Sequence, residues 1–336
     1  MICYVSTLWT LLDSAGLPDR KMTQPQSEDE EDTLLLTSMF HDPQDDQESK
    51  PKPGHITTYT PITSSLGLPT TIKINLIHSS PLYGHILTHA CLYTAHYLEK
   101  HASTIVQDKT VLEVGAGGAL PSVLCCLLGA KMVVCSDYPD YELVQNLKYN
   151  LNELNGVSRD KGRGVGYIWG NPYDVLLNAL NCVDDEDEND EKENGSGSGN
   201  GGKVVVVKEG NGVRVDGERR EKFDLIILSD VIFNHSEHYK LLQTCKDLIQ
   251  PLRSDAKTKV KVPRSGGQIL VAFSPHRPKL FNADMDFFTK AASDQFKFDV
   301  EFVELTMWEP LFKDDMDEGT RELRSRVYFY VLHPTW

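Results

Sequence analysis

The chain has 336 residues, of which 40 % are hydrophobic and 25 % are charged, enough for one large domain or two small ones. No stretch approaches the about 20 apolar residues of a membrane-spanning helix, so we expect no membrane partner. The net charge of −15 makes nucleic acid a poor partner, because acidic segments repel phosphate.

The acidity is confined to two segments. Residues 28–48 hold nine acidic residues and no Lys or Arg, and residues 184–193 hold eight acidic residues and one Lys. Together they carry −16, so the rest of the chain is nearly neutral. Such composition is typical of solvated, disordered chain, although a basic protein partner is also compatible with it. We therefore predict a disordered segment at 1–53 and one domain at 54–336.

The cysteines and the N-terminus indicate the compartment. Seven cysteines are scattered without any C-x-x-C spacing, which favours a reducing environment and hence the cytoplasm. The apolar run from Leu8 to Leu12 has no basic residue before it, so we expect no signal peptide.

Strands and helices alternate along the first half of the predicted domain. Period-two and period-3.6 hydrophobic patterns predict strands at 71–77, 110–114, 131–136 and 164–169, and helices at 84–101, 118–128 and 139–155. Strict alternation of this kind is typical of an α/β fold with a parallel, doubly wound sheet.

Residues 182–222 interrupt the alternation. They contain the second acidic run, a Gly/Ser-rich stretch and a predicted hairpin at Asn211-Gly212, and we interpret them as a surface insertion. A second polar insertion is predicted at 254–266. The remaining predicted elements are strands at 223–228 and 267–273, helices at 236–250 and 280–294, and a terminal antiparallel pair at 296–305 and 326–333.

A glycine-rich turn is the strongest functional signal. The strand that ends at Val114 runs into Gly115-Ala116-Gly117, and an apolar helix follows. Glycines allow the backbone to approach a ligand, and the helix N-terminus offers free N–H groups. Asp137 ends the next strand, 22 residues after Gly115, where a carboxylate meets the hydroxyls of a ribose. The sequence therefore predicts an adenosine-containing cofactor, against the alternative that the turn serves packing alone.

Two side chains favour S-adenosylmethionine over a dinucleotide. Leu120 occupies the third glycine position of G-x-G-x-x-G, and the carboxylate of Glu113 at the strand end would repel a pyrophosphate. A cationic amino-acid group would not be repelled. We expect no bound metal.

Residues 71–333 resemble the seven-β-strand methyltransferases, whose Rossmann-like sheet is mostly parallel with an antiparallel terminal strand. They most closely resemble the fungal protein N-terminal and lysine N-methyltransferases that act on elongation factor 1-alpha. The glycine motif is widely shared, whereas the SDVIFNH and FSPHRP segments are more specific. The resembling segments are SPLYGH at 80–85, VLEVGAGGALPS at 111–122, VCSDYPD at 134–140, FDLIILSDVIFNH at 223–235, FSPHRP at 273–278 and RSRVY at 324–328.

The resemblance implies a set of cofactor contacts. These fall on Tyr83, where the family normally has Trp, and on Gly115, Ala116, Gly117, Asp137, Trp169 and Ser229. It also implies methyl transfer to the N-terminal glycine amine and the adjacent lysine of elongation factor 1-alpha. We expect a monomer.

Polar residues after two later strands are candidates for the substrate side. Asp230 or His235 could accept the amine proton, and Asn234 with His235 could orient the amine, although a helix-capping Asn and a surface His are equally good interpretations. Pro275, His276 and Arg277 could shape the substrate entrance. The alternatives are a small-molecule, nicotinamide-like amine N-methyltransferase and an inactive cofactor-binding interaction module.

Overall fold

A seven-stranded sheet organises the computed structural model, which describes residues 54–78, 85–181, 214–215, 218–219, 221–255, 258, 260–311 and 317–336. The predictions for 1–53, for Tyr83 and for most of 182–222 lie outside these residues. Residues 51–336 form one compact unit.

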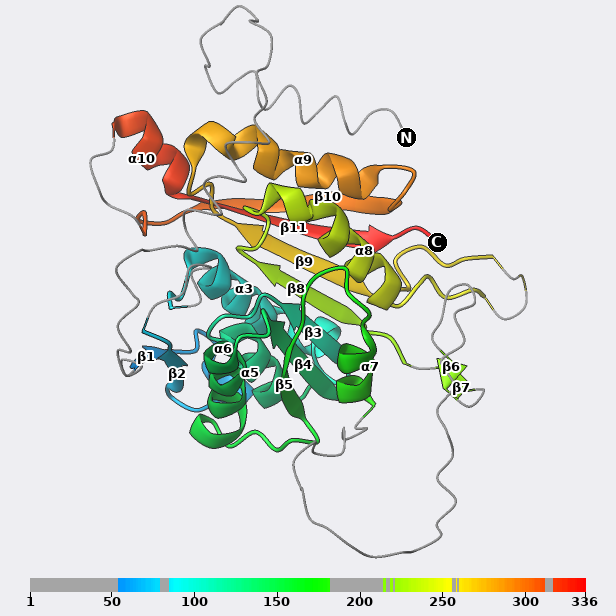
Figure 1. Ribbon diagram of the computed structural model, residues 1–336, viewed down its shortest axis with the longest axis horizontal. Coiled ribbons are helices and arrows are strands. Elements are labelled where there is room, and N and C mark those ends of the chain that lie inside the picture. The colour runs from blue at the N-terminus through cyan, green and yellow to red at the C-terminus, as the bar shows by residue number, and fades with distance from the viewer. Residues whose placement is uncertain are drawn as a thin grey trace, which may run out of the picture. The chain divides into compact units, whose positions relative to one another are not determined.

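The sheet has the order β10-β11-β9-β8-β3-β4-β5 (Figure 1). Strands β9, β8, β3, β4 and β5 are parallel, and β11 is antiparallel to both of its neighbours. This confirms the predicted fold class. The strands are β3 (Thr110–Val114), β4 (Met132–Asp137), β5 (Gly162–Gly166), β8 (Leu225–Ser229), β9 (Gln268–Phe273), β10 (Phe298–Met307) and β11 (Arg326–Pro334).

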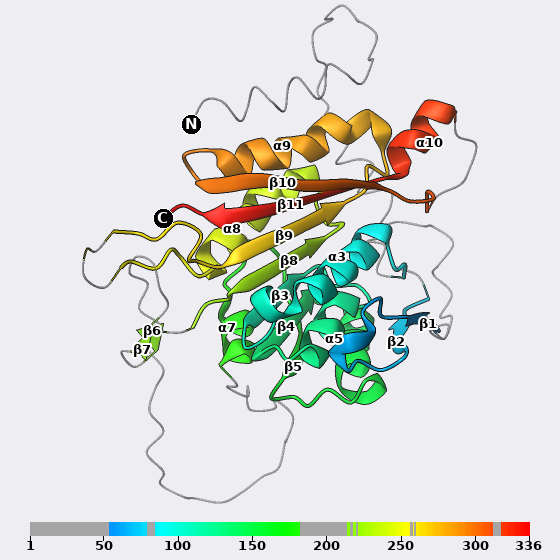
Figure 2. The same ribbon diagram turned by 180° about the vertical axis from the view of Figure 1, so that it is seen from behind.

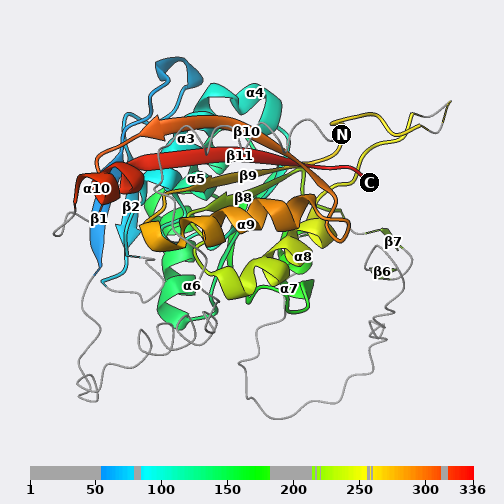
Figure 3. The same cartoon turned by 90° about the horizontal axis from the view of Figure 1, so that it is seen from above.

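Helices cover both faces of the sheet, so successive residues of a central strand enter different cores. Val111 packs with one helical layer and Leu112 with the other. Figures 1 and 2 show the two faces in turn, and Figure 3 shows the sheet between α3 and α4 on one side and α8 and α9 on the other. The first core includes α3 (His89–Lys100), α4 (Ala102–Ile105), α5 (Leu120–Leu127) and α6 (Tyr141–Lys148); the second includes α7 (Asp174–Leu180), α8 (His238–Leu248) and α9 (Phe281–Ala292).

A small N-terminal hairpin is fastened to α3 by a buried carboxylate. Strand β1 (His55–Tyr59), which was not predicted, pairs antiparallel with β2 (Ile72–Leu76), and a 3-10 turn (Ser64–Leu66) lies between them. Glu99 accepts hydrogen bonds from the Tyr59 hydroxyl at 2.5 Å and from the backbone N–H of Thr63 at 2.8 Å. Its side chain is 1 % exposed, so these bonds satisfy a group that burial would otherwise penalise.

Asparagines join the same hairpin to the glycine-rich turn. Helix α6 continues into a π-helical turn (Tyr149–Leu154), which carries Asn150. The Asn150 side-chain amide donates to the carbonyls of Asn75 at 2.8 Å and Gly118 at 3.0 Å, and its oxygen accepts from the Asn75 N–H at 2.8 Å. Strand β2 is thereby held against the loop that follows β3.

Several predicted boundaries were wrong for local reasons. The helix predicted at 84–101 begins at His89, because the Thr88 hydroxyl caps it by accepting from the Cys91 N–H. Strand β5 occupies 162–166 rather than 164–169, because its glycines lie close under α6; a Cβ on Gly164 would be 2.8 Å from the Leu147 Cβ. Helices α7 and α10 (Glu318–Arg324) were not predicted.

The described parts of the insertions contain little regular structure. Strands β6 (Arg214–Val215) and β7 (Glu218–Arg219) pair antiparallel, and the hairpin predicted at Asn211-Gly212 lies outside the described residues. The second insertion contains a bridge between Ser254 and Lys261. Among the described helices, none has both the length and the apolarity needed to cross a membrane.

Candidate active site

The glycine-rich turn leaves the carboxyl end of β3 in a conformation that glycine favours. Gly115 has φ +69° and Gly117 has φ +51°. A Cβ on Gly115 would lie 2.6 Å from Val231 Cγ1 and 3.7 Å from Trp169 Cζ2. The turn therefore passes directly between the segments that follow β8 and β5.

Asp137, at the carboxyl end of β4, orders this turn. Its two carboxylate oxygens accept one hydrogen bond each, from the N–H groups of Gly117 and Tyr138, both at 2.7 Å. Burial raises the pKa of Asp137, and these two bonds oppose that rise. A carboxylate can accept about four hydrogen bonds, so each oxygen keeps capacity for one ribose hydroxyl.

Glu113 is buried beneath the glycine-rich turn and is not exposed at its surface. Its side chain is 1 % exposed, and it accepts from both the N–H and the hydroxyl of Ser122 in the first turn of α5. Burial raises its pKa to about 8; the Ser122 bonds oppose this, and the charge of Asp137 adds to it. Glu113 thus connects β3 to α5 beneath the predicted cofactor position.

The other predicted cofactor residues separate into two groups. Ala116 donates its N–H to the Ser136 carbonyl, and Trp169, after β5, lies beside Gly115. These residues gather with Gly117 and Asp137. The hydroxyl of Ser229 instead donates to Thr94 of α3 at 3.0 Å. Tyr83 lies outside the described residues.

Asp230 forms the centre of a second group, at the carboxyl ends of β8 and β9. It has φ +62°, and its Oδ2 lies 2.7 Å from His276 Nε2 while its Oδ1 accepts from the Ser274 N–H at 3.3 Å. Burial lowers the pKa of His276, but the charge and hydrogen bond of Asp230 outweigh this, so the pKa is raised. Arg324 of α10 donates to the His276 carbonyl at 2.9 Å. The sequence placed Asp230 and His276 in separate motifs, and the fold joins them.

Asn234 and His235 have structural partners of their own. The Asn234 side chain accepts from the Ser236 hydroxyl at 3.0 Å, and His235 Nε2 lies 2.7 Å from Asp284 Oδ1 of α9. Burial raises the pKa of Asp284, and the imidazole of His235 opposes that rise. The two carboxylate–imidazole pairs are near enough for Asp284 to raise the pKa of His276 as well.

A cluster of three aromatic rings, Trp308 with His89 and His96, lies near the Asp230–His276 pair. The indole of Trp308, just after β10, lies between two imidazoles of α3, 5.1 Å from His89 and 5.7 Å from His96 between ring centroids. Burial lowers the pKa of His89, and His276 lowers it further. Sequence reasoning missed Trp308 and the contact of the Ser274 N–H with Asp230; only FSPHRP signalled this region.

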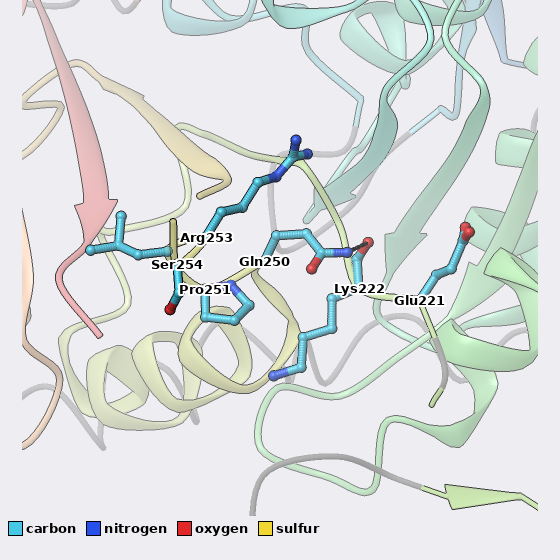
Figure 4. Close-up of a pocket in the computed structure, with 7 residues that line it drawn as sticks. Glu221, Lys222, Gln250, Pro251, Arg253 and Ser254 are labelled. Atoms are coloured by element: carbon cyan, nitrogen blue, oxygen red, sulfur yellow. Dashed lines mark hydrogen bonds between the residues drawn. The ribbon is translucent and has the colours of Figure 1, made fainter. Parts of the chain in front are cut away.

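A hollow at the amino ends of the strands is separate from the residues around the glycine turn and around Asp230. It has a volume of about 520 Å³, and Figure 4 shows the Lys222 and Arg253 side chains extending from it in different directions. Lys222 precedes β8 and Gln250 follows α8, so the hollow lies at the amino ends of the strands. Ligands of open α/β sheets bind at the carboxyl ends.

The chain was compared with known proteins, and no family model matches it. It is 37 % identical to the protein N-terminal and lysine N-methyltransferase EFM7 of Candida albicans, over 91 % of this chain and 99 % of that protein. The Candida glabrata protein of the same name is 38 % identical over 88 % of this chain and 94 % of its own length. The chain belongs to this methyltransferase family. The Schizosaccharomyces pombe member is 32 % identical over 88 % of this chain and 94 % of its own length.

The cofactor predicted from the sequence is S-adenosylmethionine. The residues around the glycine turn fit that molecule. Asp137 keeps acceptor capacity for two hydroxyls, and the indole of Trp169 lies beside the glycine turn. Within the described residues, no three His, Cys, Asp or Glu side chains could hold a metal ion.

Proposed function

We propose that this methyltransferase modifies the N-terminal glycine α-amine and the adjacent lysine of elongation factor 1-alpha, and that it acts in the cytoplasm as a monomer. The resemblance of SDVIFNH and FSPHRP to the fungal enzymes supports the target. The names of the relatives support a protein amine as the acceptor.

One observation carries the chemistry: a buried carboxylate, Asp230, lies at the end of β8, next to the strand that bears the glycine turn. When bound, S-adenosylmethionine supplies an electrophilic methyl group on a sulfonium. Asp230 attracts the cationic amine and orients it. We assign Asn234 and His235, at the start of the following 3-10 turn, to orienting the same amine.

The amine must be neutral when it reacts. An α-amine has a pKa of about 8 and a lysine about 10.4, so the α-amine needs less help at neutral pH. We assign Asp230 as the group that holds the amine while its proton leaves, with the proton passing to water or to His235. A chain terminus also threads a narrow entrance more readily than an internal lysine does.

The experiment compares two peptides with the N-terminal sequence of the factor. One has a free α-amine and the other an acetylated α-amine with the same lysine. The purified chain with labelled cofactor should methylate the free peptide on both amines and the acetylated one on lysine alone, as read by mass spectrometry. Label entering nicotinamide and neither peptide would contradict the proposal and support the small-molecule alternative.

Deletion of the gene tests the same proposal in cells. The first peptide of elongation factor 1-alpha should then lack methylation. Unchanged methylation in a strain without a second enzyme for that site would remove this substrate.

A further inference from the structure

Ser274 has a buried hydroxyl without a partner. It directly follows β9, its side chain is 6 % exposed, and its Oγ makes no hydrogen bond within the described structure. Burying an unpaired hydroxyl is unfavourable, and folded proteins rarely keep one without a reason. A ligand that binds there would supply the missing partner.

The backbone N–H of the same residue contacts the Asp230 carboxylate. The Ser274 N–H donates to Asp230 Oδ1 at 3.3 Å, whereas Oδ2 is engaged by His276 at 2.7 Å. The Oδ1 contact is long, so this oxygen retains acceptor capacity. Asp230 is also one of the few described non-glycine residues with positive φ, a strained conformation that occurs often at functional sites.

The two residues lie on the substrate side of the crevice. The strand order reverses between β3 and β8, which is where open α/β sheets bind ligands. The cofactor residues follow β3, β4 and β5, whereas Asp230 and Ser274 follow β8 and β9. A molecule that contacts both residues therefore approaches from the side opposite the cofactor.

We infer that Ser274 Oγ and Asp230 Oδ1 together form the subsite for the methyl-accepting amine. The inference rests on the proposed function. A neutral primary amine has two N–H donors and one lone pair. Two adjacent acceptors hold both hydrogens and leave the lone pair to form the N–C bond, while the C–S bond breaks and sulfur keeps its electron pair. The methylated ammonium then releases a proton to water.

Ser274→Ala tests this assignment with three measurements. The melting temperature should stay the same or rise, because the variant removes an unsatisfied buried hydroxyl. Cofactor affinity, measured by calorimetry, should not change. The kcat/KM for a peptide with a free N-terminal amine should fall about 10- to 100-fold, the usual effect of losing one such hydrogen bond.

Thr110→Val is the matched control. The Thr110 hydroxyl is also buried, but it is paired with the Lys222 carbonyl and with Asp224 at the amino end of β3. This variant should lose stability and keep its kcat/KM. Unchanged kinetics in Ser274→Ala, or a loss of cofactor affinity there, would overturn the inference and leave the proposed function standing. Failure of the wild-type chain to methylate the peptide would overturn both.

Discussion

Replacement of Gly115 by alanine separates backbone strain from steric overlap in the cofactor turn. An alanine at φ +69° has an unfavourable left-handed conformation, and its Cβ would meet Val231 Cγ1 at 2.6 Å, a separation that real contacts essentially never show. Strain costs about 1–2 kcal/mol and overpacking about 1–3 kcal/mol. We expect Gly115→Ala to lower the free energy of unfolding by about 2–5 kcal/mol and to weaken cofactor binding at least tenfold.

Gly67 supplies the control for strain. Its φ of +67° is nearly the same, but a Cβ there would meet no atom within 4 Å. Gly67→Ala should therefore cost only the strain, about 1–2 kcal/mol, and should leave the cofactor affinity unchanged.

Val231→Ala removes the methyl group that would overlap with the Cβ of an alanine at position 115. In the double variant with Gly115→Ala, the overlapping methyl is absent, so the two effects should be less than additive by about 1–3 kcal/mol. Urea unfolding measures the stabilities, and calorimetry measures cofactor affinity. If Gly115→Ala costs no more than Gly67→Ala, or if the double variant is fully additive, the steric reasoning is refuted.

Three further predictions follow from the site. Burial raises the pKa of Glu113 to about 8 from its ordinary 4.5, so the folded state keeps a proton that the unfolded state releases, and stability falls as pH rises through that window. In urea unfolding, the stability of Glu113→Gln relative to wild type should therefore increase between pH 6 and pH 8. A difference in stability that stays constant with pH would contradict this. Asp137→Asn should weaken cofactor binding about 10- to 100-fold by calorimetry, whereas Asp224→Asn, which disturbs an equally bonded carboxylate at the amino edge, should reduce stability alone. Trp169→Phe should bind cofactor nearly as wild type does and Trp169→Ala at least tenfold more weakly, as measured by calorimetry; equal affinities of the two variants would contradict a stacking contact.

The sequence predicted those parts of the fold that local patterns encode. Strand β3 was predicted at its observed bounds, because a run of buried aliphatic residues is bounded by polar residues and glycine. Strand β5 was misplaced because its sequence, GRGVG, has low strand propensity and is selected by packing under α6. Strand β1 was missed since HITTY is short and largely exposed.

The cofactor side of the candidate site could be predicted from the sequence, but the substrate side could not. The glycine turn and Asp137 belong to one βαβ unit, so their spacing along the chain is diagnostic. The pairing of Asp230 with His276 joins residues 46 positions apart, and the unpaired hydroxyl of Ser274 is a property of its surroundings in three dimensions. No periodicity or motif spacing reports such contacts.

The asparagine network between β2 and the glycine turn makes the hairpin and the cofactor site thermodynamically linked. Asn150 bonds simultaneously to Asn75 and to the carbonyl of Gly118. Coupling of this kind is reciprocal: if an ordered hairpin raises cofactor affinity by some factor, bound cofactor must suppress hairpin opening by the same factor. Amide hydrogen exchange in β2 should therefore slow when cofactor binds, and Asn150→Leu should abolish that slowing. Slower exchange in β2 on cofactor binding would show that an element outside the main sheet is an effector of the cofactor site.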